Sequence, residues 1–283
     1  MISVELKGGV VKEFENGTTP AEIAKSIGAG LYKSVCCAKV DGDLCDLRTP
    51  LEKDCRVELL TFDNVDGQKT FWHTASHVLA QAVKRLYPNA KCAIGPAVDN
   101  GFYYDFDVEK PFSPEDLEKI KAEMKKIVKS GLELERVELS PEEAEKKLEE
   151  MNEPYKVELV KEHSDKGEHI TFYKQGEFID LCAGPHLMSV APIKAIELTA
   201  CTGAYWRGDA NNAQLCRVYG VAFPKASMLE EYLKKLEEAK LRDHNKLGRE
   251  LEYFTTVDYV GQGLPILLPK GARVVQLLQR WVE

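Results

Sequence analysis

The sequence lacks the features that mark several large protein classes. No apolar run approaches the roughly 18 residues that a membrane-spanning helix needs. Residues 1–30 hold Lys7, Lys12 and Lys25 among acids and glycines, without the apolar stretch of an export signal. The net charge is −8, whereas a general nucleic-acid-binding protein is normally basic. We therefore expect a cytoplasmic protein with no membrane partner. Composition alone does not suggest RNA as a partner, although a local basic patch on an acidic protein can still bind phosphates.

Two kinds of metal or redox motif are also absent. The chain has eight cysteines but no Cys-x-x-Cys pair, so neither a zinc ribbon nor a thioredoxin-type site is indicated. Glu is absent from the position after His73, where the HExxH motif of zinc proteases places its general base. Without an export signal, we expect the eight thiols to be reduced.

The composition is that of an ordinary globular protein, with 44% hydrophobic and 30% charged residues, and 283 residues suit about two domains. Residues 1–62 show a hairpin signal at Lys7-Gly8-Gly9 and a helix between Thr19 and Gly28, which begins with a capping box. A tight turn is indicated at Asp41-Gly42, and a last strand ends near Leu60. This ββαββ order predicts a β-grasp fold.

Residues 63–224 have a mixed pattern. The polar run Asp63–Lys69 predicts a domain boundary, and a helix is expected from about Thr70 to Leu86. Ser113-Pro114 and Ser140-Pro141 each begin a further helix. Strand-like runs lie at Gly101–Phe106, Tyr155–Val160 and Ile170–Tyr173. The fold class predicted for the chain is therefore α+β.

The C-terminal part is expected to hold a linker and an incomplete domain. Residues 225–250 predict a charged linker helix, from Ser227 to about Leu247. Within residues 251–283 we expect a loop at Gly261–Pro265, a strand at Ile266–Leu268 and an amphipathic helix at Ala272–Val282. That helix has no stop signal, so residues 251–283 are predicted to be the start of a truncated domain.

The strongest chemical signal is His73-Thr74-Ala75-Ser76-His77. Histidines four residues apart lie one above the other on a helix, where they can converge on a metal or a substrate. At about 100° per residue, both point away from the apolar stripe that includes Trp72 and Leu79. Two solvated surface histidines are the alternative interpretation.

A second motif, Asp180-Leu181-Cys182-Ala183-Gly184-Pro185-His186, lies about a hundred residues later. Its Gly-Pro turn can bring Cys182 and His186 to one point. Together with His73 and His77 they have the composition of a zinc site, and they also suit metal-free hydrolysis with histidine as the base. Cys182 alone could be a small buried apolar residue, but the two motifs together favour a functional site.

These two motifs resemble the editing domain that threonyl-tRNA synthetases share with alanyl-tRNA synthetases and stand-alone alanyl-tRNA deacylases. Four more stretches are similar to the threonyl family, and the N-terminal β-grasp resembles its TGS domain. The stretches are Ala93-Ile94-Gly95-Pro96, Asp99–Asp105, Gly203–Asp209 and Arg242–Gly248. The resemblance covers essentially the whole chain. It implies a TGS domain at 1–62, a tRNA editing domain at 63–224, a linker helix at 225–250 and the entrance of a class II catalytic domain at 251–283.

The resemblance implies hydrolysis of seryl-tRNA(Thr), the mischarged product of a threonine–tRNA ligase. It assigns His73 as the base or water-positioning residue, and Lys156 to orient the substrate and stabilise charge. The substrate pocket would be formed by His77, Tyr104, Asp180, Cys182 and His186. Tyr104 and Asp180 would contact the serine or the terminal adenosine.

The resemblance implies an editing site without metal, although the alanyl relatives bind zinc at the four corresponding positions. His73, His77, Cys182 and His186 are therefore the expected ligands if zinc is present. ATP, magnesium and a further zinc are expected only in the rest of the catalytic domain, as is most of the interface of a homodimer, so these 283 residues should not aminoacylate. A stand-alone zinc-dependent deacylase and a non-catalytic RNA-binding module are the alternatives.

Overall fold

The computed structural model describes residues 1–257, 259–261 and 263–283. They form two compact units, Met1–Leu229 and Glu230–Glu283. No helix among the described residues is long and apolar enough to cross a membrane. Both units contain helices and strands, which confirms the predicted α+β class.

The first unit begins with a β-grasp sheet, here called the β-grasp part (residues 1–62). Its strands follow the order β2-β1-β5-β3-β4, in which β1 and β5 are parallel and the other neighbours are antiparallel. The predicted β-grasp fold is therefore confirmed, although the sheet has five strands rather than the four of the predicted ββαββ order. The elements are β1 (Ile2–Leu6), β2 (Val10–Phe14), α1 (Pro20–Ile27), α2 (Ala29–Ser34), β3 (Val35–Val40), β4 (Asp43–Cys45) and β5 (Cys55–Thr61).

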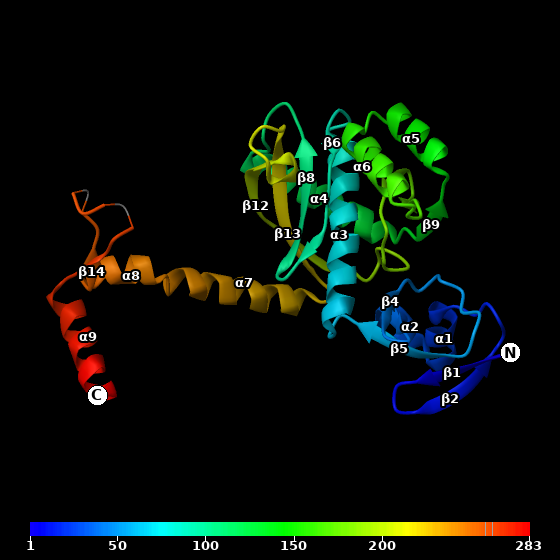
Figure 1. Ribbon diagram of the computed structural model, residues 1–283, viewed down its shortest axis with the longest axis horizontal. Helices are drawn as coiled ribbons and strands as arrows, with labels where there is room; N and C mark the ends of the chain where they lie inside the picture. The colour runs from blue at the N-terminus through cyan, green and yellow to red at the C-terminus, as the bar shows by residue number, and fades with distance from the viewer. Residues whose placement is uncertain (258, 262) are drawn as a thin grey trace. The chain divides into compact units, whose positions relative to one another are not determined.

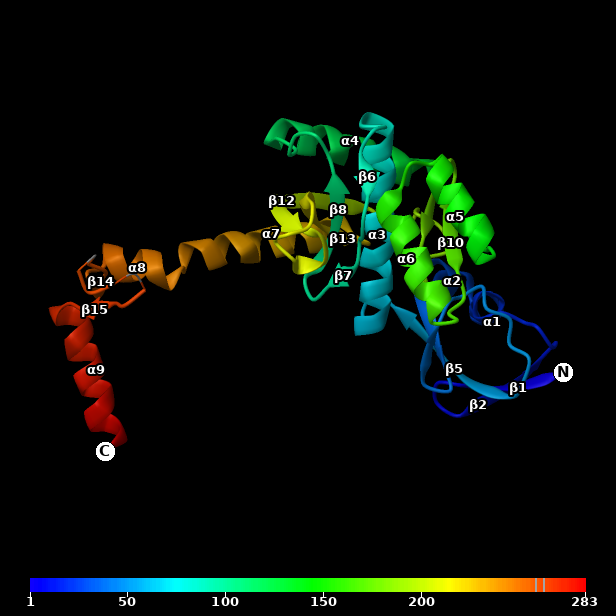
Figure 2. The same cartoon turned by 45° about the horizontal axis from the view of Figure 1, so that its top comes forward.

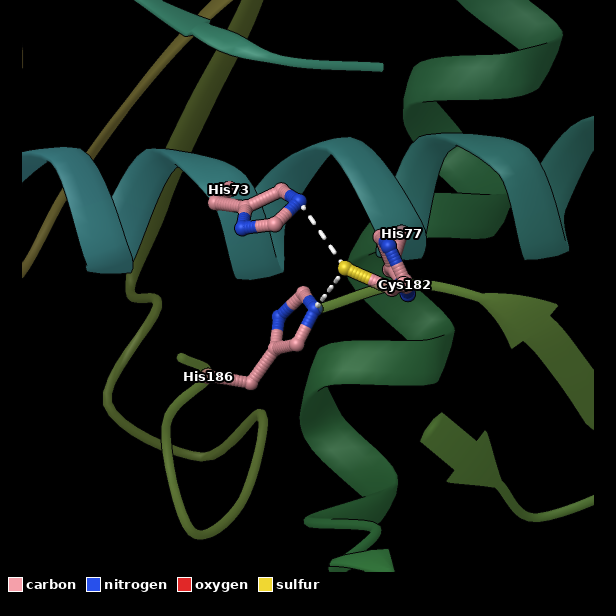
Figure 3. A group of neighbouring side chains, drawn as sticks. All are labelled: His73, His77, Cys182 and His186. Atoms are coloured by element: carbon pink, nitrogen blue, oxygen red, sulfur yellow. Dashed lines mark hydrogen bonds between the residues drawn. The ribbon is translucent and has the colours of Figure 1, made fainter. Parts of the chain in front are cut away.

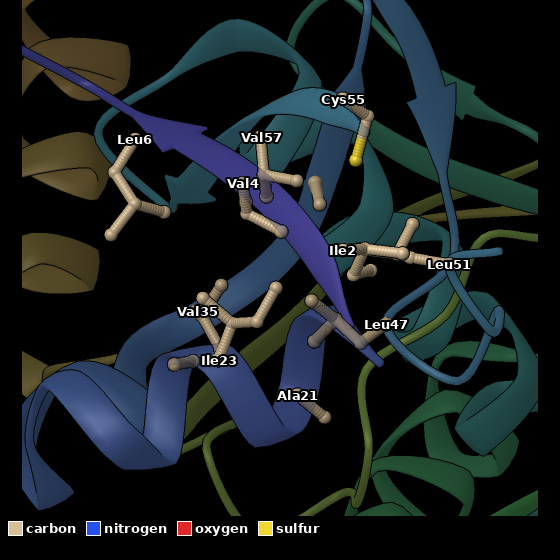
Figure 4. Close-up of a cluster of buried hydrophobic side chains, with 12 residues drawn as sticks. Ile2, Val4, Leu6, Ala21, Ile23, Val35, Leu47, Leu51, Cys55 and Val57 are labelled. Carbon is tan, nitrogen blue, oxygen red and sulfur yellow. The ribbon is translucent and has the colours of Figure 1, made fainter. Parts of the chain in front are cut away.

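Local sequence explains the β-grasp part. Thr19 and Glu22 form the capping box of α1, and Gly28 ends it. The short helix α2, which was not predicted, follows Gly28 directly. Alternate residues of β1 point into a core shared with α1 and β5, where Val4 and Ile23 are fully buried (Figure 4).

The helix α3 (Val65–Leu86) is the centre of the first unit (Figures 1 and 2). One side of α3 packs on a five-stranded sheet in the order β12-β13-β8-β6, with β7 on β8, and α4 also contacts α3. The elements are β6 (Lys91–Cys92), β7 (Ala97–Val98), β8 (Gly101–Asp107), α4 (Pro114–Ser130), β12 (Ala195–Tyr205), η1 (Trp206–Gly208) and β13 (Gln214–Phe223). The other side faces a second layer, so α3 is buried nearly all round and not only along the predicted stripe.

The second layer consists of a three-stranded sheet, β11-β10-β9, with two helices. The elements are β9 (Leu134–Glu138), α5 (Pro141–Glu150), α6 (Pro154–Asp165), β10 (Thr171–Gln175) and β11 (Phe178–Leu181). The prediction of a strand at Tyr155–Val160 is wrong, because this run lies in α6. Pro154 occupies the start of the helix, and Lys156 and Val160, four residues apart, point into the interior together.

Two further predictions need correction. The helix α3 begins at Val65 rather than Thr70, so most of the polar run expected to be a boundary is helical. The single linker helix is two helices, α7 (Ala226–Leu241) and α8 (His244–Glu250), because the Asp243 carboxylate accepts from the Lys246 N–H and caps a new helix. The predicted domain boundaries at 62, 224 and 250 remain predictions.

The second unit also contains a short hairpin and the last helix. These elements are β14 (Phe254–Thr255), β15 (Ile266–Leu267) and α9 (Pro269–Val282), which confirms the predicted strand and amphipathic helix. Gln262 of the predicted loop Gly261–Pro265 lies outside the described residues.

Candidate active site

Helix α3 and the segment that follows β11 bring the two sequence motifs together. His73 and His77 project from α3, and Cys182 and His186 lie on the segment that follows β11 (Figure 3). The Cys182 Sγ atom is 3.3 Å from His73 Nε2 and 3.2 Å from His186 Nε2. One ligand atom from each of the four side chains lies within 4.8 Å of the others. The predicted meeting of the two motifs is therefore present, and the histidines are not solvated surface residues.

The hydrogen bonds of Thr74 define the tautomer of His186. The Thr74 hydroxyl donates to the Thr70 carbonyl at 3.0 Å and accepts from the Leu187 N–H at 3.0 Å. Its oxygen is also 3.2 Å from His186 Nδ1, and because the hydroxyl proton is already used we assign the proton of that contact to Nδ1. His186 Nε2 then carries a lone pair that faces the Cys182 thiol.

His73 shows the same arrangement. Its ring hydrogen-bonds to the Pro185 backbone, where a carbonyl can only accept. Because Nε2 lies against Cys182, we assign the proton to Nδ1 and a lone pair to Nε2. Two unprotonated imidazole nitrogens therefore converge on one thiol. Gly184 completes this contact, since its N–H donates to Cys182 Sγ at 3.3 Å.

Enclosure keeps these imidazoles neutral. Burial lowers the pKa of His73 to about 4; the Asp180 carboxylate opposes this shift and the Lys156 ammonium adds to it. Burial also holds the pKa of His186 well below its usual range, helped by the positive charges that His77 and His73 would carry if protonated. At neutral pH both rings are therefore available as proton or metal acceptors.

A buried ion pair forms the opposite side of the site. Lys156 Nζ lies 2.9 Å from Asp180 Oδ1, and the Tyr104 hydroxyl donates to Asp180 Oδ2 at 2.6 Å. Burial opposes the charge on Asp180, but Lys156, His77 and these hydrogen bonds lower its pKa. Burial likewise disfavours the charge on Lys156. The interaction with Asp180 is stronger than this effect of burial, so the pKa of the Lys156 ammonium is raised. Both groups are thus charged in the interior.

These groups surround a cavity of about 370 Å³. Its wall includes His73, His77, Lys156, Asp180 and Cys182. Tyr104 and His186, which were predicted to form the pocket, are fully buried behind this wall and act on it through Asp180 and Cys182.

A smaller hollow of about 200 Å³ shares His73, Pro96 and Gly184 with the cavity and extends to Leu44 of the β-grasp part. The two hollows therefore lie next to each other on either side of His73.

The four residues His73, His77, Cys182 and His186 fit a metal by composition and spacing. In a tetrahedral zinc site a thiolate sulfur and an imidazole nitrogen are about 3.5 Å apart, close to the two contacts of Cys182. His77 Nδ1 is buried without a hydrogen-bond partner among the described residues. The cluster can therefore hold zinc, and it can equally present a neutral base beside the Lys156 ammonium.

Sequence reasoning missed several residues that hold this site. Thr74 lies inside the first motif, but only its contacts identify its role. Gly95 allows the backbone to approach Tyr104, since an added Cβ would lie 2.1 Å from the ring. Asp46 and Arg48 reach the His186 segment from the β-grasp part, with no local signal in the sequence.

Comparisons with known proteins agree with this arrangement. A family model described as "TGS domain" matches residues 2–61. A second one, described as "Threonyl and Alanyl tRNA synthetase second additional domain", matches residues 170–219, which include Asp180, Cys182 and His186.

The chain is also similar to curated threonine–tRNA ligases. It is 58% identical to the one from Clostridium perfringens over 283 residues, which is 100% of this chain and 44% of that protein. The identity to the Clostridium tetani protein is 56% over 284 residues, again 100% of this chain and 44% of that protein. The identity to the Acetivibrio thermocellus protein is 54% over 281 residues, which is 99% of this chain and 44% of that protein. The chain thus spans less than half the length of these relatives.

Proposed function

We propose that this chain, which corresponds over its whole length to the N-terminal part of threonine–tRNA ligases, hydrolyses the ester bond of mischarged seryl-tRNA(Thr). The supporting observation is the cavity between the neutral His73 ring and the buried Lys156–Asp180 pair. A cytoplasmic setting and tRNA(Thr) as the partner belong to this proposal.

The physical need for such a site follows from the size of the two amino acids. Serine lacks one methyl group of threonine, and one methyl group is worth only about 1–3 kcal/mol of discrimination, or roughly 10- to 200-fold. An aminoacylation site that binds threonine therefore also accepts some serine. A second site that hydrolyses the smaller product removes the error.

The chemistry needs a base and a partner for developing negative charge. The unprotonated Nε2 of His73 accepts a proton as the oxygen of a water molecule attacks the carbonyl carbon of the ester. The Lys156 ammonium stabilises the oxyanion that forms. The bond between the carbonyl carbon and the ribose oxygen then breaks, the ribose oxygen takes up the proton that His73 accepted from the water, and serine leaves.

Asp180 is suited to substrate recognition as well as to holding Lys156. Its carboxylate reaches the cavity wall, where it can accept a hydrogen bond from the ammonium of the seryl group. Tyr104 binds the other oxygen of Asp180 and fixes its direction. Tyr104 thus acts on the substrate through Asp180.

The same cluster supports zinc as an alternative way to activate water. His73, His77, Cys182 and His186 would hold the ion, and a water bound to it as a fifth ligand would have its pKa lowered to about 7. Our proposal is the metal-free form, because His73 and Lys156 already supply the base and the positive charge.

We further propose that a chain as long as the curated relatives attaches threonine to tRNA(Thr) with ATP and magnesium, as a homodimer. That activity would belong to the part of those proteins that this chain does not cover.

Release of serine and of threonine distinguishes these proposals. Purified chain is mixed with seryl-tRNA(Thr) or threonyl-tRNA(Thr), and free amino acid is followed with time. The editing proposal predicts rapid release of serine and slow release of threonine. Binding of both tRNAs without release of either amino acid would instead favour a non-catalytic RNA-binding module.

A further inference from the structure

The segment 182–188, which carries Cys182 and His186, is held in place from the β-grasp part. Asp46 lies directly after β4, and its Oδ2 accepts a hydrogen bond from the His186 backbone N–H at 3.1 Å. The same oxygen accepts from the Tyr173 hydroxyl at 2.8 Å. The Tyr173 ring in turn packs edge-on against the His186 ring, with ring centres 4.4 Å apart. Asp46 therefore orients both the backbone and the ring of His186.

Arg48 holds the next part of the same segment. Its guanidinium donates to the carbonyl oxygens of His186 at 3.3 Å, Leu187 at 2.7 Å and Leu134 at 3.0 Å. It also binds Asp46 Oδ1 at 3.0 Å, so the two side chains act as one unit. Their side chains are only 5% and 15% exposed, for Asp46 and Arg48 respectively. Hydrogen bonds to charged groups in such an enclosed place are stronger than those on the surface.

These contacts continue directly into the site. Asp46 and Arg48 fix the backbone on both sides of His186, Thr74 fixes its Nδ1, and its Nε2 then faces the Cys182 thiol. Asp46 and Arg48 can therefore influence the reaction without touching the substrate. A displacement of about 1 Å in a catalytic group can lower a rate by roughly a hundredfold.

We propose that Asp46 and Arg48 are positioning residues of the hydrolytic site, so that the β-grasp part serves as the template on which segment 182–188 is shaped. The catalytic part of this inference rests on the proposed editing function. The structural part, that Asp46 and Arg48 order the segment, can be tested without it.

The first test compares Asp46→Ala and Arg48→Met with a matched control. Lys39→Met removes the ion pair of Lys39 with Asp66 (2.6 Å), which also joins the β-grasp part to α3 but does not touch segment 182–188. We expect kcat for serine release to fall about 10- to 100-fold in the two test variants, with little change in KM. Asp46→Asn and Arg48→Lys should recover part of the loss, and Lys39→Met should match the wild type.

Thermal unfolding of every variant separates positioning from simple loss of fold. The conservative variants Asp46→Asn and Arg48→Lys are expected to unfold near the wild-type temperature while still showing a reduced kcat. Wild-type kcat in all four Asp46 and Arg48 variants would overturn the proposal, and so would an equal loss of kcat in Lys39→Met.

The second test does not depend on catalysis. The exchange rate of the His186 amide proton is measured by NMR in the wild type, Asp46→Ala and Lys39→Met. We expect this proton to exchange about tenfold faster or more only in Asp46→Ala, because that variant loses the acceptor. If the wild-type chain releases no serine, the editing function fails, and the exchange rates alone decide this inference. Equal exchange in Asp46→Ala and the wild type would contradict it.

Discussion

Lys156 and Asp180 form an ion pair in the interior, with 2.9 Å between Nζ and Oδ1 and each side chain only 5% exposed. The two residues come from different elements, α6 and the end of β11. Burying two charges is unfavourable unless they are paired and hydrogen-bonded, and here Tyr104 supplies a further bond to Asp180. The pair places a positive charge beside the neutral His73 ring, which is the combination that ester hydrolysis needs.

Replacing Lys156 by methionine should remove most of the activity and weaken the fold. The variant loses the partner of a developing oxyanion and leaves Asp180 buried without its cation. We expect a loss of about 3–5 kcal/mol in the free energy of unfolding and at least about a hundredfold loss in the rate of serine release. Urea denaturation and the hydrolysis assay measure the two effects.

The matched control for this change is Lys161→Met. Lys161 lies on the same helix with its side chain 58% exposed and only a long 3.9 Å contact to Glu145. Both stability and rate should stay near wild type. A similar loss in the two variants would mean that the buried pair has no special role.

The dependence of the rate on pH should show a base that stays neutral in mild acid. The pKa of His73 is lowered to about 4 from an ordinary value of 6.5, so the ring remains unprotonated between pH 7 and pH 5. Hydrolysis should therefore show no loss through protonation of His73 over this interval. The contradicting result is a fall in the wild-type rate with an apparent pKa near 6.5, if the residual rate of His73→Asn shows no such fall.

The same shift predicts how stability depends on pH. Below pH 6.5 the unfolded chain takes up a proton at His73 that the folded chain does not, so acidification favours unfolding. This contribution to stability is fully present above pH 6.5 and is lost between pH 6.5 and about 4. In His73→Asn the free energy of unfolding should fall less steeply over that range, as measured by urea denaturation at several pH values.

Thr74→Val should disturb His186 without changing the shape of α3. Valine has nearly the same size as threonine, but it cannot bind His186 Nδ1 or the Leu187 N–H. We expect a cost of about 1–3 kcal/mol in the free energy of unfolding, because two buried donors lose their acceptor, together with a lower rate of serine release. The same substitution at the exposed Thr202 of β12 is the control and should have little effect on either quantity.

Gly95→Ala should loosen the support behind the ion pair. The new methyl group would lie 2.1 Å from the Tyr104 ring, so the ring or the backbone must move. We expect destabilisation of about 1–3 kcal/mol and a reduced rate, because Tyr104 no longer holds Asp180. Gly30→Ala in α2 is the control: its new methyl group meets no atom within 4 Å, and alanine favours a helix. Equal behaviour of the two variants would argue against tight packing at Gly95.

Much of this site could be predicted from sequence because its signals are local. The spacing of His73 and His77 indicates one face of a helix, and the Gly-Pro turn indicates that Cys182 and His186 lie close together. Ser113 and Ser140 carry complete capping boxes, so the starts of α4 and α5 were predicted correctly.

What could not be predicted depends on contacts between distant parts of the chain. The run around Lys156 contains valines that favour strands, but burial of Lys156 against Asp180 and of Val160 in the second layer stabilises a helix instead. Asp46 and Arg48 act 138 to 140 residues along the chain from His186. No pattern near either residue indicates such a contact.

The central claim is hydrolysis of the seryl ester at this site by groups of the protein itself. It is tested most directly by the rate of serine release from seryl-tRNA(Thr) after dialysis of the chain against a chelator, and again after zinc is added back. Our account predicts the same rapid release before and after chelation, and no gain from added zinc. Loss of release on chelation with recovery on addition of zinc would contradict it and would assign His73, His77, Cys182 and His186 to a zinc-dependent deacylase.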